Sequence, residues 1–260
     1  MTAPQKAFGD HLREWRQRRR LSQLDLALDA EISTRHLSFL ETGRAKPSRD
    51  MVIRLAEQLE TPLRERNALL MAAGFAPVFV ERPLDDPALA PARRAIDLIL
   101  EGHSPYPALV IDLRWNLVAA NGAVAPLMAG TAPDLHGPPL NVMRLALHPR
   151  GLAPRIVNFA EWRAHLLERL RRQAALSNDP GLAELLEEVL TYPVPPAPDR
   201  RPEDFGGVAV PLQLMVGDQV LSFLSTVTVF GAALDVTLSE LSLETFFPAD
   251  QATADALRTL

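Results

Sequence analysis

The sequence contains no cysteine in its 260 residues. This absence excludes disulfide scaffolds, thiolate nucleophiles, zinc fingers and iron–sulfur clusters, and it favours a reducing compartment. Long apolar runs are also lacking. The first twenty residues hold no apolar signal-peptide core, and no later stretch approaches the roughly twenty apolar residues of a membrane span. We therefore expect a cytoplasmic protein that is neither exported nor inserted in a membrane.

The common catalytic and cofactor motifs are missing as well. None of GxSxG, GxxxxGK, GxGxxG or HExxH occurs, so the usual hydrolase, nucleotide-binding and zinc-protease signatures are absent. His136, His148 and His165 are scattered, with no carboxylate at metal-ligand spacing. The sequence thus predicts that the protein is not an enzyme and needs no metal or cofactor. A haem or flavin sensor, with His148 or His165 as an iron ligand, stays open as a minor alternative.

What is present divides the chain into two parts of opposite charge. Hydrophobic residues make up 47% and charged residues 23%, which is ordinary for globular proteins. Residues 1–80 hold 13 Lys and Arg against 10 Asp and Glu, a net charge of +3, whereas residues 81–260 hold 14 against 22, a net charge of −8. Length and charge together predict two domains.

The N-terminal part reads as five short helices separated by short turns. Helix-start signals for the second to fifth helices lie at Ser22, at Ser33 or Thr34, at Ser48, and at Thr61–Pro62. In the second helix, Leu24, Ala27 and Leu28 are expected on one inward side. We therefore predict an all-helical domain over residues 1–76, followed by a proline-rich linker over residues 77–92.

Residues 93–260 mix helical and strand patterns. Strands are expected at 108–112 and 116–119, in a long hairpin from Val208 to Phe230 that turns at Gly217–Asp218, and at about 241–247. Helices are expected at about 141–147, 155–175 and after Asp179–Pro180. The fold class predicted is therefore multidomain, with an all-α five-helix domain followed by an α+β domain.

The strongest motif is SQLDLALDAEISTRHLSFLETGRAKPS, which runs from Ser22 to Ser48. A helix-turn-helix needs a small residue where its two helices cross, an apolar anchor in the turn, and a second helix with an outer face free to reach base edges. Ala27, Ile32 and the pair Leu37 and Leu40 meet these needs in order. The segment resembles the Xre/Cro and repressor type of helix-turn-helix, and the similarity extends over about residues 8–73.

This resemblance implies contacts with double-stranded DNA. Thr34, Arg35 and Phe39 take the positions where the family's recognition helix meets base edges, although Phe39 departs from the polar residue often found there. Gln23, Ser33, Arg44 and Lys46 take positions of phosphate contact. The family also pairs the positions of Arg16 and Glu41 as a structural salt bridge. The DNA-binding residues expected are Gln23, Ser33, Thr34, Arg35, Phe39, Arg44 and Lys46.

The second part carries three segments, starting at Pro105, Asn141 and Ser225, that resemble the MmyB-like ligand-binding domain of helix-turn-helix regulators. The resemblance implies a PAS-like sheet flanked by helices and an apolar pocket for a fatty-acyl-like small molecule. Arg144 and Tyr106 are candidates for contact with a polar head at the mouth of the pocket. The ligand-binding residues expected are Trp115, Met143, Phe223, Val227 and Phe230.

Taken together, the sequence predicts a DNA-binding transcriptional regulator controlled by an apolar small molecule. We also expect a homodimer, because one small helix-turn-helix reads too few base pairs for useful affinity. One further alternative comes from another class. The C-terminal domain could instead be a protein-interaction module without a ligand, in which case its core would enclose no cavity above about a few hundred Å³.

Overall fold

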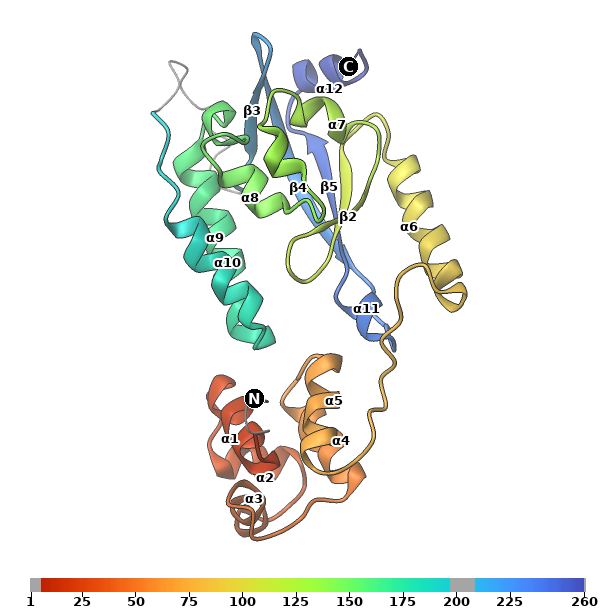
Figure 1. Ribbon diagram of the computed structural model, residues 1–260, viewed down its shortest axis with the longest axis vertical. Coiled ribbons are helices and arrows are strands. Elements are labelled where there is room, and N and C mark those ends of the chain that lie inside the picture. Colours follow the sequence, from red (N-terminus) through yellow and green to blue (C-terminus); the bar gives the residue numbers. More distant parts are fainter. Residues whose placement is uncertain (1–5, 197–208, 260) are drawn as a thin grey trace. The chain divides into compact units, whose positions relative to one another are not determined.

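The computed structural model describes residues 6–196 and 209–259, and the predicted hairpin residue Val208 lies outside them (Figure 1). The chain divides into two compact units. One consists of the described chain up to Arg82 together with the short segments Ala175–Asn178 and Ala232–Ser239, and the remaining described residues form the other. The two units are treated separately below.

The N-terminal unit is helical, as predicted. Its helices within the described chain up to Arg82 are α1 (Phe8–Arg18), α2 (Gln23–Asp29), α3 (Thr34–Glu41), α4 (Arg49–Gln58) and α5 (Leu63–Ala72). Three of them begin at the expected serines. Ser22, Ser33 and Ser48 each accept a hydrogen bond from the backbone N–H three residues later, at 3.1 to 3.2 Å. Side-chain capping therefore sets these boundaries.

The core of this unit differs from the expectation at α2. Leu26 and Ala27 are buried, whereas Leu24 and Leu28 are exposed. The prediction that Leu24 and Leu28 face inward is wrong, because a seven-residue helix with leucines on several sides does not fix its own inward face. Contacts with α3 and α4 select Leu26 and Ala27 instead.

The C-terminal unit contains helices and strands that alternate along the chain. From η1 onward the described elements are η1 (Pro87–Leu89), α6 (Ala90–Gly102), β1 (Ala108–Ile111), β2 (Leu117–Ala120), α7 (Val124–Met128), η2 (Pro133–His136), α8 (Val142–Leu147), η3 (Ala153–Arg155), α9 (Phe159–Ser177), α10 (Pro180–Leu190), β3 (Leu212–Val216), β4 (Gln219–Val229), α11 (Val236–Ser239), β5 (Ser242–Pro248) and α12 (Gln251–Leu257). Of these, α11 and the last residues of α9 fall in the N-terminal unit. The predicted strands and the β3–β4 hairpin are present. The short helices α7 and α12 were not anticipated.

The described strands form one antiparallel, five-stranded sheet in the order β2-β1-β5-β4-β3. In this order the C-terminal strand β5 lies between β1 and β4. Glu244 on β5 is directly opposite Leu109 on β1 and Val227 on β4. Because side chains alternate along a strand, Glu244 and Phe246 share one face of the sheet, while Leu243 and Thr245 share the other.

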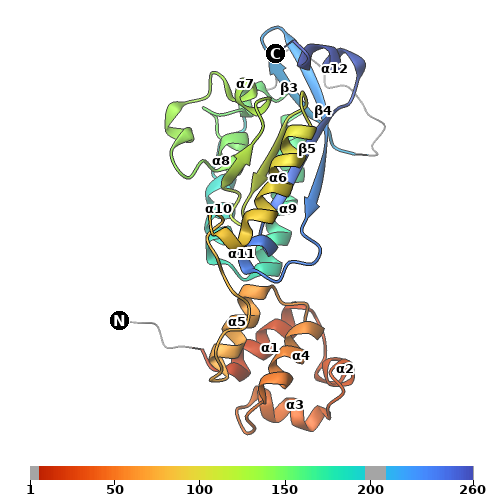
Figure 2. The ribbon, with the colours of Figure 1, turned by 90° about the vertical axis from the view of Figure 1, so that its right-hand side faces the viewer.

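Helices cover both faces of the sheet. Helix α6 lies on one side, and α8, α9 and α10 lie on the other (Figures 1 and 2). The larger core forms on the second side, where the stripes of α9 and α10 pack against β3 and β4. Among the described residues, no helix combines the length and apolar character that crossing a membrane requires. The face beneath α8 and α9 is where the site described below is found.

Candidate functional site

The outer surface of α3 carries an aromatic ring with two arginines beside it. The guanidinium carbons of Arg35 and Arg44 lie 5.3 and 5.9 Å from the centroid of the Phe39 ring. Arg35 and Arg44 are exposed, and Phe39 is half-buried. Cation–π contacts of this kind hold guanidinium groups in place at the surface. The ring therefore orients two positive charges along α3.

The other residues expected at DNA lie around this cluster, with one exception. Thr34 is the first residue of α3, Ser33 is its capping residue, and Lys46 is exposed in the following loop. Gln23 instead turns into the domain, where its amide nitrogen donates to a carboxylate oxygen of Glu41 at 2.7 Å. In this arrangement the Gln23 amide holds α2 to the end of α3 within the domain.

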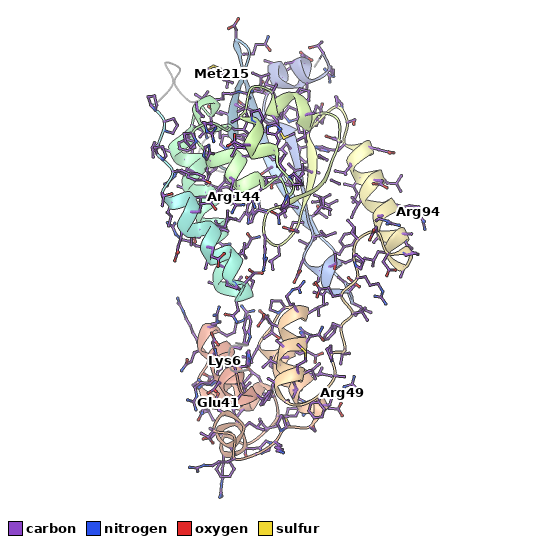
Figure 3. The ribbon with its side chains drawn as sticks, in the orientation of Figure 1. Lys6, Glu41, Arg49, Arg94, Arg144 and Met215 are labelled. Atoms are coloured by element: carbon purple, nitrogen blue, oxygen red, sulfur yellow. The ribbon has the colours of Figure 1, made fainter. Side chains whose placement is uncertain are left out.

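Glu41 connects α1, α2 and α3. Its side chain, labelled in Figure 3, is buried. It accepts hydrogen bonds from Arg16 Nε at 2.6 Å and Arg16 Nη2 at 3.1 Å, in addition to the bond from Gln23. Burial raises the pKa of the Glu41 carboxyl, but these hydrogen bonds and the positive charges of Arg16 and Arg13 together outweigh burial, and the pKa lies below its ordinary value. The predicted Arg16–Glu41 pair is confirmed by these contacts.

A glycine brings α1 against the end of α3. A Cβ atom built on Gly9 lies 2.5 Å from the carbonyl oxygen of Glu41 and 2.7 Å from that of Leu40. Real Cβ atoms essentially never approach other atoms so closely, so any larger residue must push the two helices apart. This contact gave no sequence signal, because Gly9 sits among ordinary helix-forming residues.

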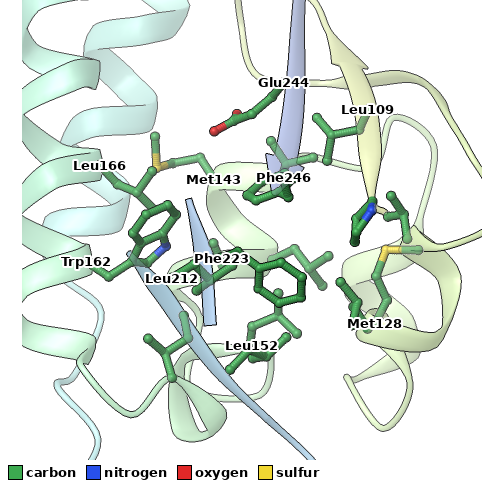
Figure 4. Close-up of a pocket in the computed structure, with 18 of the residues that line it drawn as sticks. Leu109, Met128, Met143, Leu152, Trp162, Leu166, Leu212, Phe223, Glu244 and Phe246 are labelled. Carbon is green, nitrogen blue, oxygen red and sulfur yellow. The ribbon is translucent and has the colours of Figure 1, made fainter. Parts of the chain in front are cut away.

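In the C-terminal unit, a cavity of about 100 Å³ lies between the sheet and helices α7, α8 and α9. Its wall is almost entirely apolar, with contributions from Leu109, Met128, Met143, Trp162 and Phe246 (Figure 4). The wall thus combines residues from both layers of the fold. Ligand pockets are typically concave and apolar with a few placed polar groups, and the wall of this cavity has that character. Its volume of about 100 Å³ is smaller than the few hundred Å³ that separated a ligand pocket from an interaction module in the expectation above.

The turn between β1 and β2 places Trp115 in the wall. Trp115 has a φ of +65°, which is rare for a bulky residue, and its side chain is buried. The Asp112 carboxylate holds the turn by accepting from Arg114 N at 2.8 Å and from Asn116 N and Nδ2 at 2.9 Å each. The indole Nε1 donates to Gln173 Oε1 at 2.7 Å. These contacts offset the backbone strain and fix the ring.

Of the five residues expected at the ligand, three line the cavity and two do not. Trp115, Met143 and Phe223 are in its wall. Val227 is 47% exposed, and neither Val227 nor Phe230 contributes to the wall. Strand β3 pairs with β4 only as far as Phe223, so Val227 lies on an exposed strand edge beyond β3, and Phe230 follows the end of β4. Strand periodicity identifies the correct face but not how far the cavity follows it.

Sequence reasoning missed the charged group of the site. Glu244 is only 5% exposed and is the one ionisable side chain among the described residues that line the cavity. Arg169 Nη1 lies 3.2 Å from both of its carboxylate oxygens. The Arg169 guanidinium in turn lies 4.5 Å from the centroid of the Trp115 ring. An acidic residue within the apolar strand sequence LSLETFF was the available signal.

The polar residues considered for the cavity mouth have other contacts. Arg144 forms a two-point ion pair with Glu188, at 2.9 and 2.7 Å, and neither Arg144 nor Tyr106 lines the cavity. His148 packs edge-on against Tyr192, and His165 lies beside Trp162. Burial lowers the pKa of His165. Within residues 6–196 and 209–259, no group of three or more potential ligands is placed to hold a metal ion.

Comparison with known families follows the same division of the chain. Residues 7–69 match the model described as a helix-turn-helix domain, and residues 92–260 match the model described as the MmyB-like transcription regulator ligand binding domain. A search of curated proteins finds no match. The first region contains α3 with Arg35 and the nearby Arg44, and the second contains the sheet and the cavity. Since the second match alone spans more than half of the chain, the protein belongs to the MmyB-like family of helix-turn-helix transcription regulators.

Proposed function

We propose that this DNA-binding transcription regulator is controlled by an apolar small molecule that occupies the cavity between the sheet and α8. The observation that carries the proposal is the cavity wall, which is apolar except for Glu244 and the indole nitrogens of Trp115 and Trp162. A five-stranded antiparallel sheet in the order β2-β1-β5-β4-β3 supports a PAS-like classification for residues 93–260. The linker is assigned to residues 77–92 and the DNA-binding domain to residues 1–76.

The size of the cavity limits the ligand. At roughly 10–15 Å³ for each water-sized position, a cavity of about 100 Å³ holds about seven to ten non-hydrogen atoms. An alkyl or acyl chain of that length fits the apolar wall. Each methylene that leaves water for such a wall contributes about 0.8 kcal/mol, which corresponds to about a fourfold gain in affinity.

The test is a thermal-shift titration of the full-length protein with 1-alkanols from four to twelve carbons. Affinity should rise with each carbon and level off when the cavity is full. Ala146, on α8, lines the cavity, and Ala146→Leu adds three carbons to its interior. In this variant the affinity should stop rising at a chain length two to three carbons shorter than in the wild type. Ala164→Leu is the matched control, because Ala164 is exposed on α9.

Two results would contradict the proposal. If no alcohol stabilises the protein at any length, the cavity has no apolar effector, and the protein-interaction module becomes the better account of the C-terminal domain. If Ala164→Leu lowers the chain length at which affinity levels off as much as Ala146→Leu does, binding occurs outside the cavity. A ligand acts on DNA affinity only through its different affinity for the two states of the regulator.

On DNA, we assign base reading to Thr34, Arg35 and Phe39 and backbone contact to Ser33, Arg44 and Lys46. The exposed Arg35 of α3 supports this division, since a guanidinium fork pairs with guanine O6 and N7, whereas Arg44 lies in the loop after the helix. Gln23 is retained only as a positioning residue, because its amide is bonded to Glu41. A dimer would place two such helices on half-sites about one helical turn apart.

The assignment is tested on a site selected from random DNA. Arg35→Ala should cost about 1–3 kcal/mol on that site and relax the preference at one base pair. Lys46→Ala should weaken specific and random DNA alike and reduce the salt dependence by about one unit. Equal losses on both kinds of DNA for both variants would refute these roles. Footprinting with sedimentation then distinguishes paired half-sites bound by a dimer from a single half-site bound by a monomer.

A further inference from the structure

The polar end of the cavity has spare hydrogen-bonding capacity. Glu244 is almost fully buried, and Arg169 is the only described residue in hydrogen-bonding contact with its carboxylate. A single nitrogen, Nη1, is shared between both oxygens at 3.2 Å, at the long end of the range for such bonds. A carboxylate offers about four acceptor positions, so most of them are unused by the protein.

Glu41 is a buried carboxylate in the same chain whose hydrogen-bonding capacity is used more fully. Glu41 receives three N–H groups at 2.6, 2.7 and 3.1 Å, and these come from Arg16 and Gln23. Glu41 does not line the cavity. Glu244 differs on both counts, because it is bonded loosely and it faces an open space (Figure 4). Burying a carboxylate without full hydrogen bonding is costly, so a donor that enters this space gains from the unused oxygens.

Arg169 itself is not available to the ligand. Its guanidinium is held 4.5 Å from the Trp115 ring centroid, and the residue is not part of the cavity wall. A ligand in the cavity therefore meets the negative oxygens of Glu244 before it meets any positive charge. A carboxylate head would be repelled by these oxygens, whereas a hydroxyl or an ammonium group would donate to them.

From this geometry we propose that the effector is an apolar molecule carrying a hydrogen-bond donor, a hydroxyl or a protonated amine, which binds Glu244. The inference rests on the proposed function and specifies its ligand class. The apolar part of the ligand would pack against the apolar wall, and its hydrogen-bond donor would bind Glu244 on β5. Fatty acids with a free carboxylate are thereby disfavoured as effectors of this protein.

The test compares four probes of similar length against the full-length protein, with thermal shift and tryptophan fluorescence as readouts. They are 1-octanol, octylamine, octanoate and heptyl methyl ether. The ether is an isomer of octanol that accepts but cannot donate a hydrogen bond. Because a hydrogen bond to a charged group is worth more than a neutral one, octanol and octylamine should bind about tenfold or more tightly than the ether and octanoate.

A variant locates the preference at Glu244. Glu244→Gln keeps the side-chain volume and removes the charge, so the advantage of octylamine over the ether should fall about tenfold and octanoate should no longer be penalised. Glu168→Gln, at an exposed position of α9, should behave as the wild type. If Glu244→Gln fails to fold, the four-probe series on the wild-type protein still decides the question.

The possible outcomes are distinct. Tighter binding of the two donors in the wild type supports the inference. Equal affinity for all four probes, or tightest binding of octanoate, overturns it and leaves the apolar-effector proposal standing. Absence of any shift with all four probes refutes the apolar-effector proposal, and this inference with it.

Discussion

Replacement of Gly9 by alanine tests how closely α1 packs against the end of α3. In most exposed helix positions a glycine-to-alanine change stabilises by up to about 1 kcal/mol, because alanine has the higher helix propensity. At Gly9 the new methyl would lie 2.5 to 2.8 Å from three backbone atoms of Leu40 and Glu41. Backbone atoms cannot rotate away, so the helices must separate by about 1 Å to restore a normal contact of about 3.5 Å.

Such overpacking typically costs 1–3 kcal/mol, which exceeds the propensity gain. The expected net effect of Gly9→Ala is a loss of about 1–2 kcal/mol in the stability of the helical domain. The displacement also strains the Arg16–Glu41 pair, because Glu41 is part of the same contact. DNA affinity should fall as well, since α3 is held by these contacts.

Hydrogen exchange of the full-length protein, read from peptides within residues 6–72, measures the effect where it occurs. Protection should fall about tenfold for each 1.4 kcal/mol lost, while peptides from the sheet remain unchanged. Gly102→Ala is the matched control. Gly102 also lies in a helix, but a Cβ built there meets no atom within 4 Å. If the Gly9→Ala protein is as protected as the wild type, the close contact does not exist as described.

Two more predictions concern buried carboxylates and turns. The pKa of Glu41 is lower in the folded protein than its ordinary value of 4.5. Its ion pair therefore stabilises the helical domain fully at pH values above 4.5, and this stabilisation is lost as the pH falls through the folded-state pKa. Glu41→Gln should flatten the acid limb of a stability-against-pH curve, and an unchanged curve would contradict the argument. Asp112→Ala removes three hydrogen bonds from the turn that holds Trp115, so it should cost about 1–3 kcal/mol in urea unfolding and change the tryptophan emission. Asp97→Ala, at an exposed position of α6, should do neither, and equal effects of the two variants would rule out this role for the turn.

Local chemistry made much of the fold predictable. Ser22, Ser33, Ser48 and Asp179 accept hydrogen bonds from backbone N–H groups of the helices that follow them, and this capping depends only on neighbours in the chain. The same holds for the β3–β4 hairpin with its Gly217–Asp218 turn, where strand alternation and turn chemistry act over a few residues. The helix-turn-helix and ligand-binding regions were recognisable for a related reason, since their motifs are continuous segments.

The sequence by itself therefore determined the two regions, most of their elements, and Trp115, Met143 and Phe223 as inward residues of the second region. Only the tertiary structure decided which of these residues surround a space. It left Val227 outside the wall, since β4 is an exposed edge beyond its pairing with β3, and it brought Glu244 to the wall, since β5 lies between β1 and β4. The close contact of Gly9 with α3 was decided in the same way. Burial and cavities arise from the meeting of segments distant in sequence, and local periodicity carries no information about that meeting.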